Sequence, residues 1–370
     1  MNKDFVLTMR IKITPNRSMY PLVAIFLLIV GLAVQADNRW PVLPEPVSNN
    51  AVALVRIKDN PVLLSFMGLA QDKDWRAVHN RVFSYQLGQN AWQPRQPVPS
   101  SLPLTGRLAA IAVGIGEDAY LFGGYTVAED HEEISSPDNY RYSLLTNTYD
   151  VLAPSPVPVD DAVALVYQER FIYLISGWHN DGNVNLVQIY DIENNAWQQA
   201  SPFPGKAVFG HAGGIVGNVM LICDGVSVRY HPEKRRDFTM ESACFRGEID
   251  SKNQSRINWT TVPHPTATGR YRMAASGLDD RGVIAFVGGA TNPYNFNGIG
   301  YNGAPAEPSA DVWLYQIESG KWQVVTSGHA SMDHRGLLVV EDELLRVGGM
   351  QAKQSVSDKI FIDNISEILP

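Results

Sequence analysis

Short apolar stretches separated by turns run along almost the whole chain, and they show almost no helical periodicity. Runs such as AYLFGG (119–124), FIYLISG (171–177) and VIAFVGG (283–289) end in glycine, and each follows another short apolar run. Brief runs rich in β-branched and aromatic residues and bounded by glycine are typical of strands. The pattern therefore predicts an all-β chain made of many short strands.

These strands fall into repeated units that each end near an aromatic residue. Successive aromatics lie 48 to 63 residues apart, and a tyrosine stands seven residues before the aromatic in four of the copies. Four short strands repeated about every 50 residues predict a β-propeller, in which each unit forms one blade. The recurring aromatic residues are Trp40, Trp92, Tyr149, Trp197, Trp259 and Trp322.

The glycine pairs and the tyrosine–aromatic spacing resemble the repeats of the kelch family. The resemblance covers roughly residues 37–366 and implies a propeller fold, while it leaves the activity open. Three copies lack the first glycine of the pair, at Met67, Ser176 and Asp224. We expect one propeller domain over 37–370, with blades at about 49–99, 106–158, 160–204, 207–265, 269–327 and 334–366.

The last unit, 334–366, supplies only three strands, the last being KIFIDNI (359–365). The missing aromatic-containing strand is available near the other end of the chain, where RWPVLPEPVS (39–48) has the character of a unit's final strand. Pairing the two segments would cover a sheet edge that otherwise invites aggregation. The sequence therefore predicts a six-bladed propeller closed by an N-terminal strand (37–48) in the C-terminal blade.

The first residues have the order of a targeting segment. Four basic residues precede the apolar stretch PLVAIFLLIVGLAV (21–34), and small residues come before Asp37. This order predicts a cleaved signal peptide over 1–36 and a periplasmic or secreted protein without a stable membrane span. An uncleaved anchor is the alternative, although fourteen apolar residues are few for crossing a bilayer.

The charge balance narrows the choice of partner. The whole chain carries a formal charge of −8, and removal of residues 1–36 takes away four positive charges and one negative charge, which leaves −11. An acidic surface repels nucleic acid and anionic lipid, so neither is an expected partner. The sequence also lacks a zincin helix, a phosphate-binding glycine loop, a nucleophile elbow and a dinucleotide fingerprint.

Ligand contacts of a propeller gather on one face, where the chain enters each first strand and where second strands connect to third strands. Arginines there would suit a carboxylate, a phosphate or a sugar diol, and aspartate and histidine can exchange protons near neutral pH. The alternative is that these groups pair with one another and with the backbone to satisfy the rim. The residues just before the six innermost strands are Asn50, Arg107, Asp161, His211, Arg272 and Arg335.

Loops between second and third strands add further candidates for ligand contact. Trp178 and His179 lie in the loop of the third unit, and Tyr294 and Tyr301 in the long loop of the fifth, where aromatic rings could stack on a sugar. The alternative is that these loops are turns and packed segments without a ligand. The acidic stretch 128–138 could hold a cation or form a solvated loop.

The chain has two cysteines, both in the fourth unit. Cys223 lies near the end of that unit's second strand and Cys244 near the start of its third. Directly opposed residues of antiparallel strands are close enough for a disulfide, which we predict here. The alternative is a pair of buried free thiols, since cysteine packs well in strands.

Among kelch propellers, the chain is similar to the exported six-bladed sialic acid mutarotases in its leader, its blade number and its end-to-end closure. This resemblance implies a mutarotase or epimerase that needs neither cofactor nor metal and acts on an acidic sugar. We assign proton exchange to Asp161 and His211, and carboxylate binding to Arg107, Arg272 and Arg335. The alternative is a non-catalytic propeller that binds a glycan or a protein partner on the same face.

Overall fold

The computed structural model describes residues 39–233 and 236–369. One compact unit begins at Trp40 and holds the rest of the described chain. The expected signal peptide, 1–36, lies outside the described residues. Within the described ranges, no helix has the length and apolar character of a membrane span.

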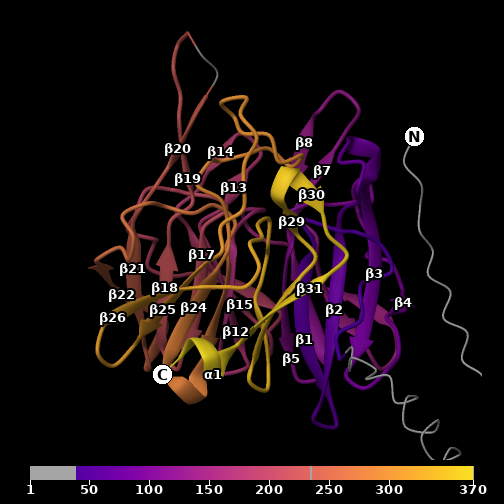
Figure 1. Cartoon of the computed structure of the whole chain (residues 1–370), viewed down its shortest axis with the longest axis horizontal. Helices are drawn as coiled ribbons and strands as arrows, with labels where there is room; N and C mark the ends of the chain where they lie inside the picture. The colour runs from indigo at the N-terminus through magenta and orange to yellow at the C-terminus, as the bar shows by residue number, and fades with distance from the viewer. Residues whose placement is uncertain (1–38, 234–235, 370) are drawn as a thin grey trace, which may run out of the picture. The chain divides into compact units, whose positions relative to one another are not determined.

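The unit that begins at Trp40 is a six-bladed β-propeller, which confirms the predicted fold class (Figure 1). Each blade is an antiparallel sheet whose strands follow chain order from the axis outwards. Blade one contains β1 (Ala51–Ile57), β2 (Asn60–Leu69), β3 (Val78–Gln86) and β4 (Gln93–Arg95). Blade two contains β5 (Ile111–Ile115), β6 (Asp118–Phe122), β9 (Asn139–Ser143) and β10 (Thr148–Val151). Blade three contains β11 (Val163–Tyr167), β12 (Phe171–Ile175), β15 (Val187–Asp191) and β16 (Ala196–Gln199).

The other three blades have the same order of strands, and the last one is a strand short. Blade four contains β17 (Ala212–Val216), β18 (Val219–Cys223), β21 (Cys244–Asp250) and β22 (Asn253–Val262). Blade five contains β23 (Ala274–Leu278), β24 (Val283–Val287), β25 (Asp311–Gln316) and β26 (Lys321–Thr326). Blade six contains β27 (Leu338–Val340), β28 (Glu343–Val347) and β31 (Ile360–Asn364).

Small hairpins follow the second strand in four blades, and they gather at the upper end of the propeller in Figure 1. Short 3₁₀ turns and one short helix, α1, complete the described elements. The hairpins are β7–β8 (Tyr125–Val127, Glu133–Ser135), β13–β14 (Trp178–His179, Gly182–Asn183), β19–β20 (Val226–Arg229, Asp237–Met240) and β29–β30 (Met350–Gln351, Ser355–Val356). The helical turns are Trp75–Ala77, Asp279–Arg281, Ala352–Gln354 and α1 (Ile365–Ile368).

Most of the apolar core lies between neighbouring blades, and a further cluster packs among the connecting loops and hairpins. Among the described residues, each of the six blade-to-blade interfaces holds its own cluster of buried apolar side chains. Between blades one and two, for example, Phe66 and Tyr142 meet edge to face with their ring centroids 5.5 Å apart. Burial of such large side chains contributes about 1.5–3 kcal/mol each, so the interfaces supply much of the stability.

The glycine pairs of the repeat form backbone contacts between each blade and the next. The amide of the second glycine donates to a backbone carbonyl of the following blade, as in Gly177 to Val208 (2.8 Å) and Gly289 to Ser331 (2.9 Å). A Cβ on the first glycine would meet the same carbonyl, since one built at Gly288 lies 2.3 Å from the Ser331 oxygen. The pair therefore recurs because the blades approach through their backbones.

The seam between the ends of the ring uses the same contact. Gly349 in blade six donates to the carbonyl of Val47 at 2.8 Å, and the amides of Leu43 and Val47 donate to Asp358 and Ser357. The segment from Trp40 to Val47 is therefore paired with blade six as predicted, although its three prolines prevent a regular ladder. Trp40 is 6% exposed and packs on the Tyr85 ring.

Candidate functional site

Six equivalent residues surround the axis where the chain enters the innermost strands, and we call them the axial ring. The residue before each of them forms an isolated β-bridge to the residue that follows the glycine pair of its own blade. All six have left-handed backbone conformation, which is uncommon outside glycine and is favoured only where the surroundings enforce it. The members are Asn49, Ala109, Asp161, Gly210, Arg272 and Asp333, with φ between 50° and 69°.

Backbone hydrogen bonds link several members of the axial ring in sequence. The Asp161 amide donates to Ala109 (3.0 Å), the Gly210 amide to Asp161 (2.8 Å) and the Arg272 amide to Gly210 (2.7 Å). These bonds satisfy polar groups that would otherwise be buried without partners. The positions of the ring side chains are consequently fixed by the backbone.

Charged side chains of the ring and of Arg335, two positions beyond it, meet in a buried network. Arg272 donates from Nε to Asp161 (2.9 Å) and from Nη1 to Asp333 (3.1 Å), and Nη2 of Arg335 lies 3.1 Å from Asp161. The Asn49 amide donates to Asp333 at 2.6 Å and accepts from Arg335. The four charged side chains are at most 3% exposed. We call these five residues the axial charge cluster; its two cations and two anions balance.

The axial charge cluster lies between two cavities. A central channel of about 460 Å³ is lined by the innermost strands, and a second cavity of about 800 Å³, the mouth cavity, lies among the hairpins. Asp161 and Arg272 line both, whereas His211 and Arg335 line only the channel. The structure thus brings Asp161, Arg272 and Arg335 together but leaves His211 on the channel side.

His211 is held as a neutral ring. Its Nε2 lies 2.9 Å from the Ile175 carbonyl, so Nε2 carries the proton, and its Nδ1 has no partner among the described residues. Burial lowers the pKa of His211 to about 4, and this outweighs the opposing effects of the Ile175 bond and the Asp161 charge. His211 therefore remains uncharged at neutral pH.

Arg107 lies apart from the predicted site. It is 1% exposed, and its Nη1 donates to the Gly123 carbonyl (2.9 Å) and to Ser136 Oγ (3.1 Å). Its guanidinium also lies over the Tyr140 ring, 5.8 Å from the centroid. Arg107 therefore does not join Arg272 and Arg335 as expected, because it precedes the ring member Ala109 by two positions and bonds to the loops of its own blade.

Asn49 and Asp333 belong to the axial charge cluster but were not among the predicted residues. The sequence pattern predicts Asn50 for the first unit and Arg335 for the last. These residues lie one position beyond Asn49 and two positions beyond Asp333, the actual ring members. The glycine pair could have supplied the register, because the residue after it pairs with the residue before the ring member. Counting from the pair would have aligned the six ring positions.

The aromatic candidates are divided between the mouth cavity and its support. Trp178 and Tyr301 line the mouth cavity, where both stack against Phe238 with ring centroids 6.3 and 3.7 Å away. Tyr294 is fully buried and its hydroxyl lies 3.5 Å from Asp333, so it supports the axial charge cluster. His179 bonds through Nδ1 to the Pro158 carbonyl at 2.7 Å and is absent from the mouth-cavity lining.

Two adjacent aspartates at the mouth cavity have opposite electrostatic surroundings. Burial raises the pKa of Asp160 well above its ordinary value, and the charge of Asp161 adds to this against a 2.7 Å hydrogen bond from Ser135. Burial also pushes the pKa of Asp161 upward, but Arg272 and Arg335 more than offset it and the pKa is lowered. The pKa values of these two neighbouring carboxyl groups are therefore shifted in opposite directions.

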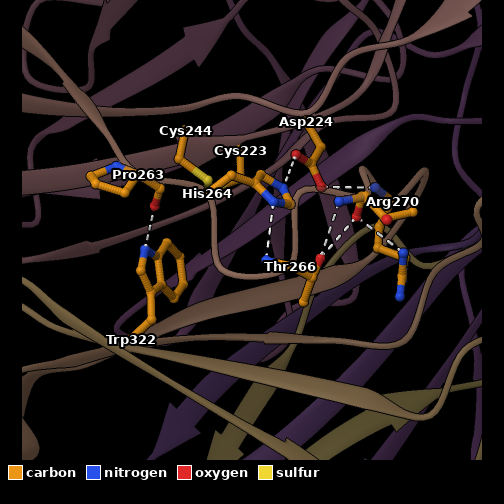
Figure 2. The surroundings of a disulfide bond; sticks show 9 residues. Cys223, Asp224, Cys244, Pro263, His264, Thr266, Arg270 and Trp322 are labelled. Atoms are coloured by element: carbon orange, nitrogen blue, oxygen red, sulfur yellow. Dashed lines mark hydrogen bonds and ion pairs between the residues drawn. A yellow bond between two sulfur atoms is a disulfide. The ribbon is translucent and has the colours of Figure 1, made fainter.

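Cys223 and Cys244 form a disulfide, with the two sulfur atoms 2.05 Å apart and the residues directly opposed on β18 and β21. Asp224 and His264 lie beside it, joined by a 2.7 Å bond from His264 Nε2 to Asp224 Oδ1 (Figure 2). This group lies outside both cavity linings. It is therefore separate from the candidate ligand site.

The fold and the repeat define the chain as a kelch-repeat propeller with a central channel and a mouth cavity. No protein-family model matches the sequence. The chain is 24% identical to human Kelch-like protein 15 over 296 residues, 77% of this chain and 44% of that protein. It therefore spans less than half the length of that relative.

Two further similarities extend over most of the chain. N-acetylneuraminate epimerase of Salmonella enteritidis PT4 (strain P125109) is 20% identical over 388 residues, which cover 91% of this chain and 93% of that enzyme. The solved structure of YjhT superimposes with a TM-score of 0.67 at 17% identity, over 88% of this chain and 99% of that one. At this identity the structural likeness supports the fold alone.

Proposed function

We propose that the chain is a sugar mutarotase or epimerase that works in the mouth cavity without a cofactor. The observation that carries the proposal is the pair of adjacent aspartates in the lining of that cavity, one with a raised pKa and one with a lowered pKa. Carboxyl groups with separated pKa values are suited to act as an acid and a base in one reaction. The extended similarity to N-acetylneuraminate epimerase supports the same class of reaction.

Anomer exchange needs two proton transfers, and the aspartate pair can supply both. Asp160 donates its proton to the ring oxygen as the bond from that oxygen to the anomeric carbon breaks. The anomeric hydroxyl gives its proton to Asp161, and an open-chain carbonyl forms. Rotation about the adjacent carbon–carbon bond and the reverse steps close the other anomer, restoring both carboxyl groups. Because the arginines stabilise the Asp161 carboxylate, Asp161 is a weak base and Asp160 supplies the larger share of the catalysis.

The charge balance of the mouth cavity favours a neutral sugar over an acidic one. Its described lining residues include two arginines, Arg236 and Arg272, and each is already ion-paired, to Asp181 at 2.8 Å and to Asp161 at 2.5 Å. A sugar carboxylate at Arg272 would have to displace Asp161, at the cost of leaving a buried charge unpaired. At Arg236 it would compete with Asp181, whose side chain is 85% exposed. Tyr301 and Trp178 provide aromatic surface for a neutral pyranose.

The test is a saturation-transfer NMR measurement of anomer exchange, with neutral sugars and sialic acid supplied in parallel. We expect the full chain to accelerate exchange of a neutral sugar and Asp160→Asn to reduce the acceleration at least tenfold, with the rate falling as pH rises through the raised pKa of Asp160. The control is Asp59→Asn, which changes an exposed aspartate outside the mouth-cavity lining. Equal rates for Asp160→Asn and the unchanged chain would refute the assignment.

A non-catalytic propeller that binds a glycan or a protein partner is the second candidate, and its support is the similarity to Kelch-like protein 15. Saturable sugar binding without faster exchange would favour this reading over catalysis. Export is a further proposal, supported by the basic and apolar order of residues 1–36. N-terminal sequencing of the mature protein tests it, since a chain that still begins at Met1 would contradict cleavage.

A further inference from the structure

Three potential metal ligands of different chemical type lie together in blade four. Asp224, Cys244 and His264 each offer one ligand atom, and these three atoms lie within 4.8 Å of one another. Figure 2 shows the disulfide sulfur beside the His264 ring, with the Asp224 carboxylate on the other side of that ring's edge. We propose that reduction of the Cys223–Cys244 disulfide converts this group into a zinc site whose ligands are Cys244, His264 and Asp224.

The ligand set matches the preferences of zinc. Zinc binds thiolate, imidazole and carboxylate groups, with four ligands in a tetrahedron and bond lengths of about 2.0–2.3 Å. Ligand atoms of such a site lie roughly 3–4 Å from one another, and the observed group is already gathered within 4.8 Å. Cys223 is the register partner of Cys244, so its freed sulfur or a water can complete the tetrahedron.

The three ligands come from the ends of successive strands, which fix their positions. Asp224 follows β18, Cys244 begins β21, and His264 lies two residues beyond β22. The free oxygen of Asp224 accepts from the Arg270 amide at 2.7 Å, and Trp322 Nε1 donates to the Pro263 carbonyl at 2.7 Å (Figure 2). Such outer contacts orient metal ligands and raise affinity.

The oxidation state decides whether the site can exist. A disulfide sulfur carries no negative charge, so the oxidised group offers only His264 and Asp224, which bond to each other. A phosphine reductant breaks the S–S bond and becomes a phosphine oxide by taking the oxygen of a water, and the two protons of that water go to the two sulfurs. Zinc binding then releases the Cys244 thiol proton to solvent. It also replaces the hydrogen bond from His264 Nε2 to Asp224, and the Nε2 proton moves to Nδ1.

One existing contact opposes binding. His264 Nδ1 accepts from the Thr266 amide at 3.2 Å, and zinc on Nε2 moves the ring proton to Nδ1. Thr266 is partly exposed, so water can take the place of this contact. The same partly exposed loop gives an entry path for the metal, because the His264 side chain is 8% exposed while Asp224 is fully covered.

Cobalt titration of the full chain, before and after treatment with the phosphine, tests the proposal, because cobalt in a thiolate site absorbs visibly and is displaced by zinc. We expect one cobalt per reduced chain with a sulfur-to-cobalt charge-transfer band, and no uptake by the oxidised chain. His264→Ala and Asp224→Asn should each weaken binding at least tenfold. His329→Ala, which changes an exposed histidine between blades five and six, is the matched control and should bind as the unchanged chain does.

Circular dichroism shows whether the reduced chain remains folded. If reduction unfolds it, Cys223→Ser decides, since this variant cannot form the disulfide yet retains Cys244, Asp224 and His264. We expect that variant to bind cobalt without reductant, or to regain its fold when zinc is added. A folded reduced chain that takes up no cobalt, binding that His264→Ala leaves unchanged, or a Cys223→Ser chain that zinc neither binds nor refolds would each overturn the proposal.

Discussion

The axis and the seam both close the ring of blades, but they do so with different forces. At the axis, Arg272 and Arg335 join Asp161 and Asp333 across blades three, five and six by buried ion pairs. At the seam, the segment Trp40–Val47 joins blade six to blade one by backbone bonds and apolar contacts. The seam gains stability from burial. The axis depends on every charged partner being present, because removing one of them leaves another buried charge unpaired.

The largest effect is expected at the seam. Deleting residues 40–47 removes Trp40, Leu43 and Val47, all at most 6% exposed, and uncovers the edge of blade six. Loss of three buried apolar side chains should cost about 5–9 kcal/mol of unfolding free energy, which we expect to be seen as aggregation or a sharply lowered denaturant midpoint. Val42→Ala is the control, since Val42 is 53% exposed. A deleted chain that melts like the full one would exclude this closure.

At the axis, Arg272→Leu should leave Asp161 and Asp333 without one of their two arginine partners. Breaking a buried pair in this way costs about 3–5 kcal/mol, to be measured by urea unfolding. Arg141→Leu provides the comparison, because the Arg141 side chain is 44% exposed and its pair with Asp150 should contribute less than about 1 kcal/mol. Similar losses for both variants would show that the cluster is no more than ordinary surface pairing.

The disulfide adds a covalent link within one blade, away from both axis and seam. It closes a loop with a sequence separation of 21 residues, so Cys223→Ala with Cys244→Ala should lower the unfolding free energy by about 3 kcal/mol in the chain-entropy account. Thiol titration of the unfolded, unreduced protein should find no reactive thiol. Two thiols per chain would show that the bond is absent in solution.

Acid should lower the stability of the fold through the buried His211 beside the axis. The pKa of His211 is about 4 in the folded chain and about 6.5 when unfolded, so its contribution is complete above pH 6.5 and is lost as the pH falls towards 4. The slope is about 1.4 kcal/mol per pH unit for this one group. His211→Gln should therefore flatten the pH dependence of unfolding by that amount, and an unchanged slope would mean that His211 is protonated in the folded chain.

The fold was predictable because its signals are local and repeated. The tyrosine–aromatic spacing occurs in four units and the second glycine of the pair in all six, and the lack of a final strand in 334–366 indicates the closure. The exceptions keep the same backbone: Met67, Ser176 and Asp224 stand where a first glycine is expected, and all three have positive φ. Propeller geometry tolerates them because their side chains find room or partners, as Ser176 Oγ does at the Val208 carbonyl.

The candidate site was predictable only in part, because it depends on register to the single residue. A shift of one or two positions replaces Asp333 by Arg335 and Ala109 by Arg107, and the sequence near the axis has no marker of its own. The error in register also changes which partners the predicted arginines have. The three arginines of the prediction have separate roles, since Arg107 bonds backbone carbonyls whereas Arg272 and Arg335 neutralise aspartates.

The bond from Gly349 to Val47 also has a consequence in time. Its two residues are separated by 302 positions, and a ribosome delivers the Val47 segment first. That segment must wait, with its apolar side chains uncovered, until the sixth blade emerges. Contacts between such distant residues form slowly because a large loop has to be closed before they contribute. The last step of folding is thus the meeting of the earliest and the latest parts of the propeller, and until then both edges are open to other chains.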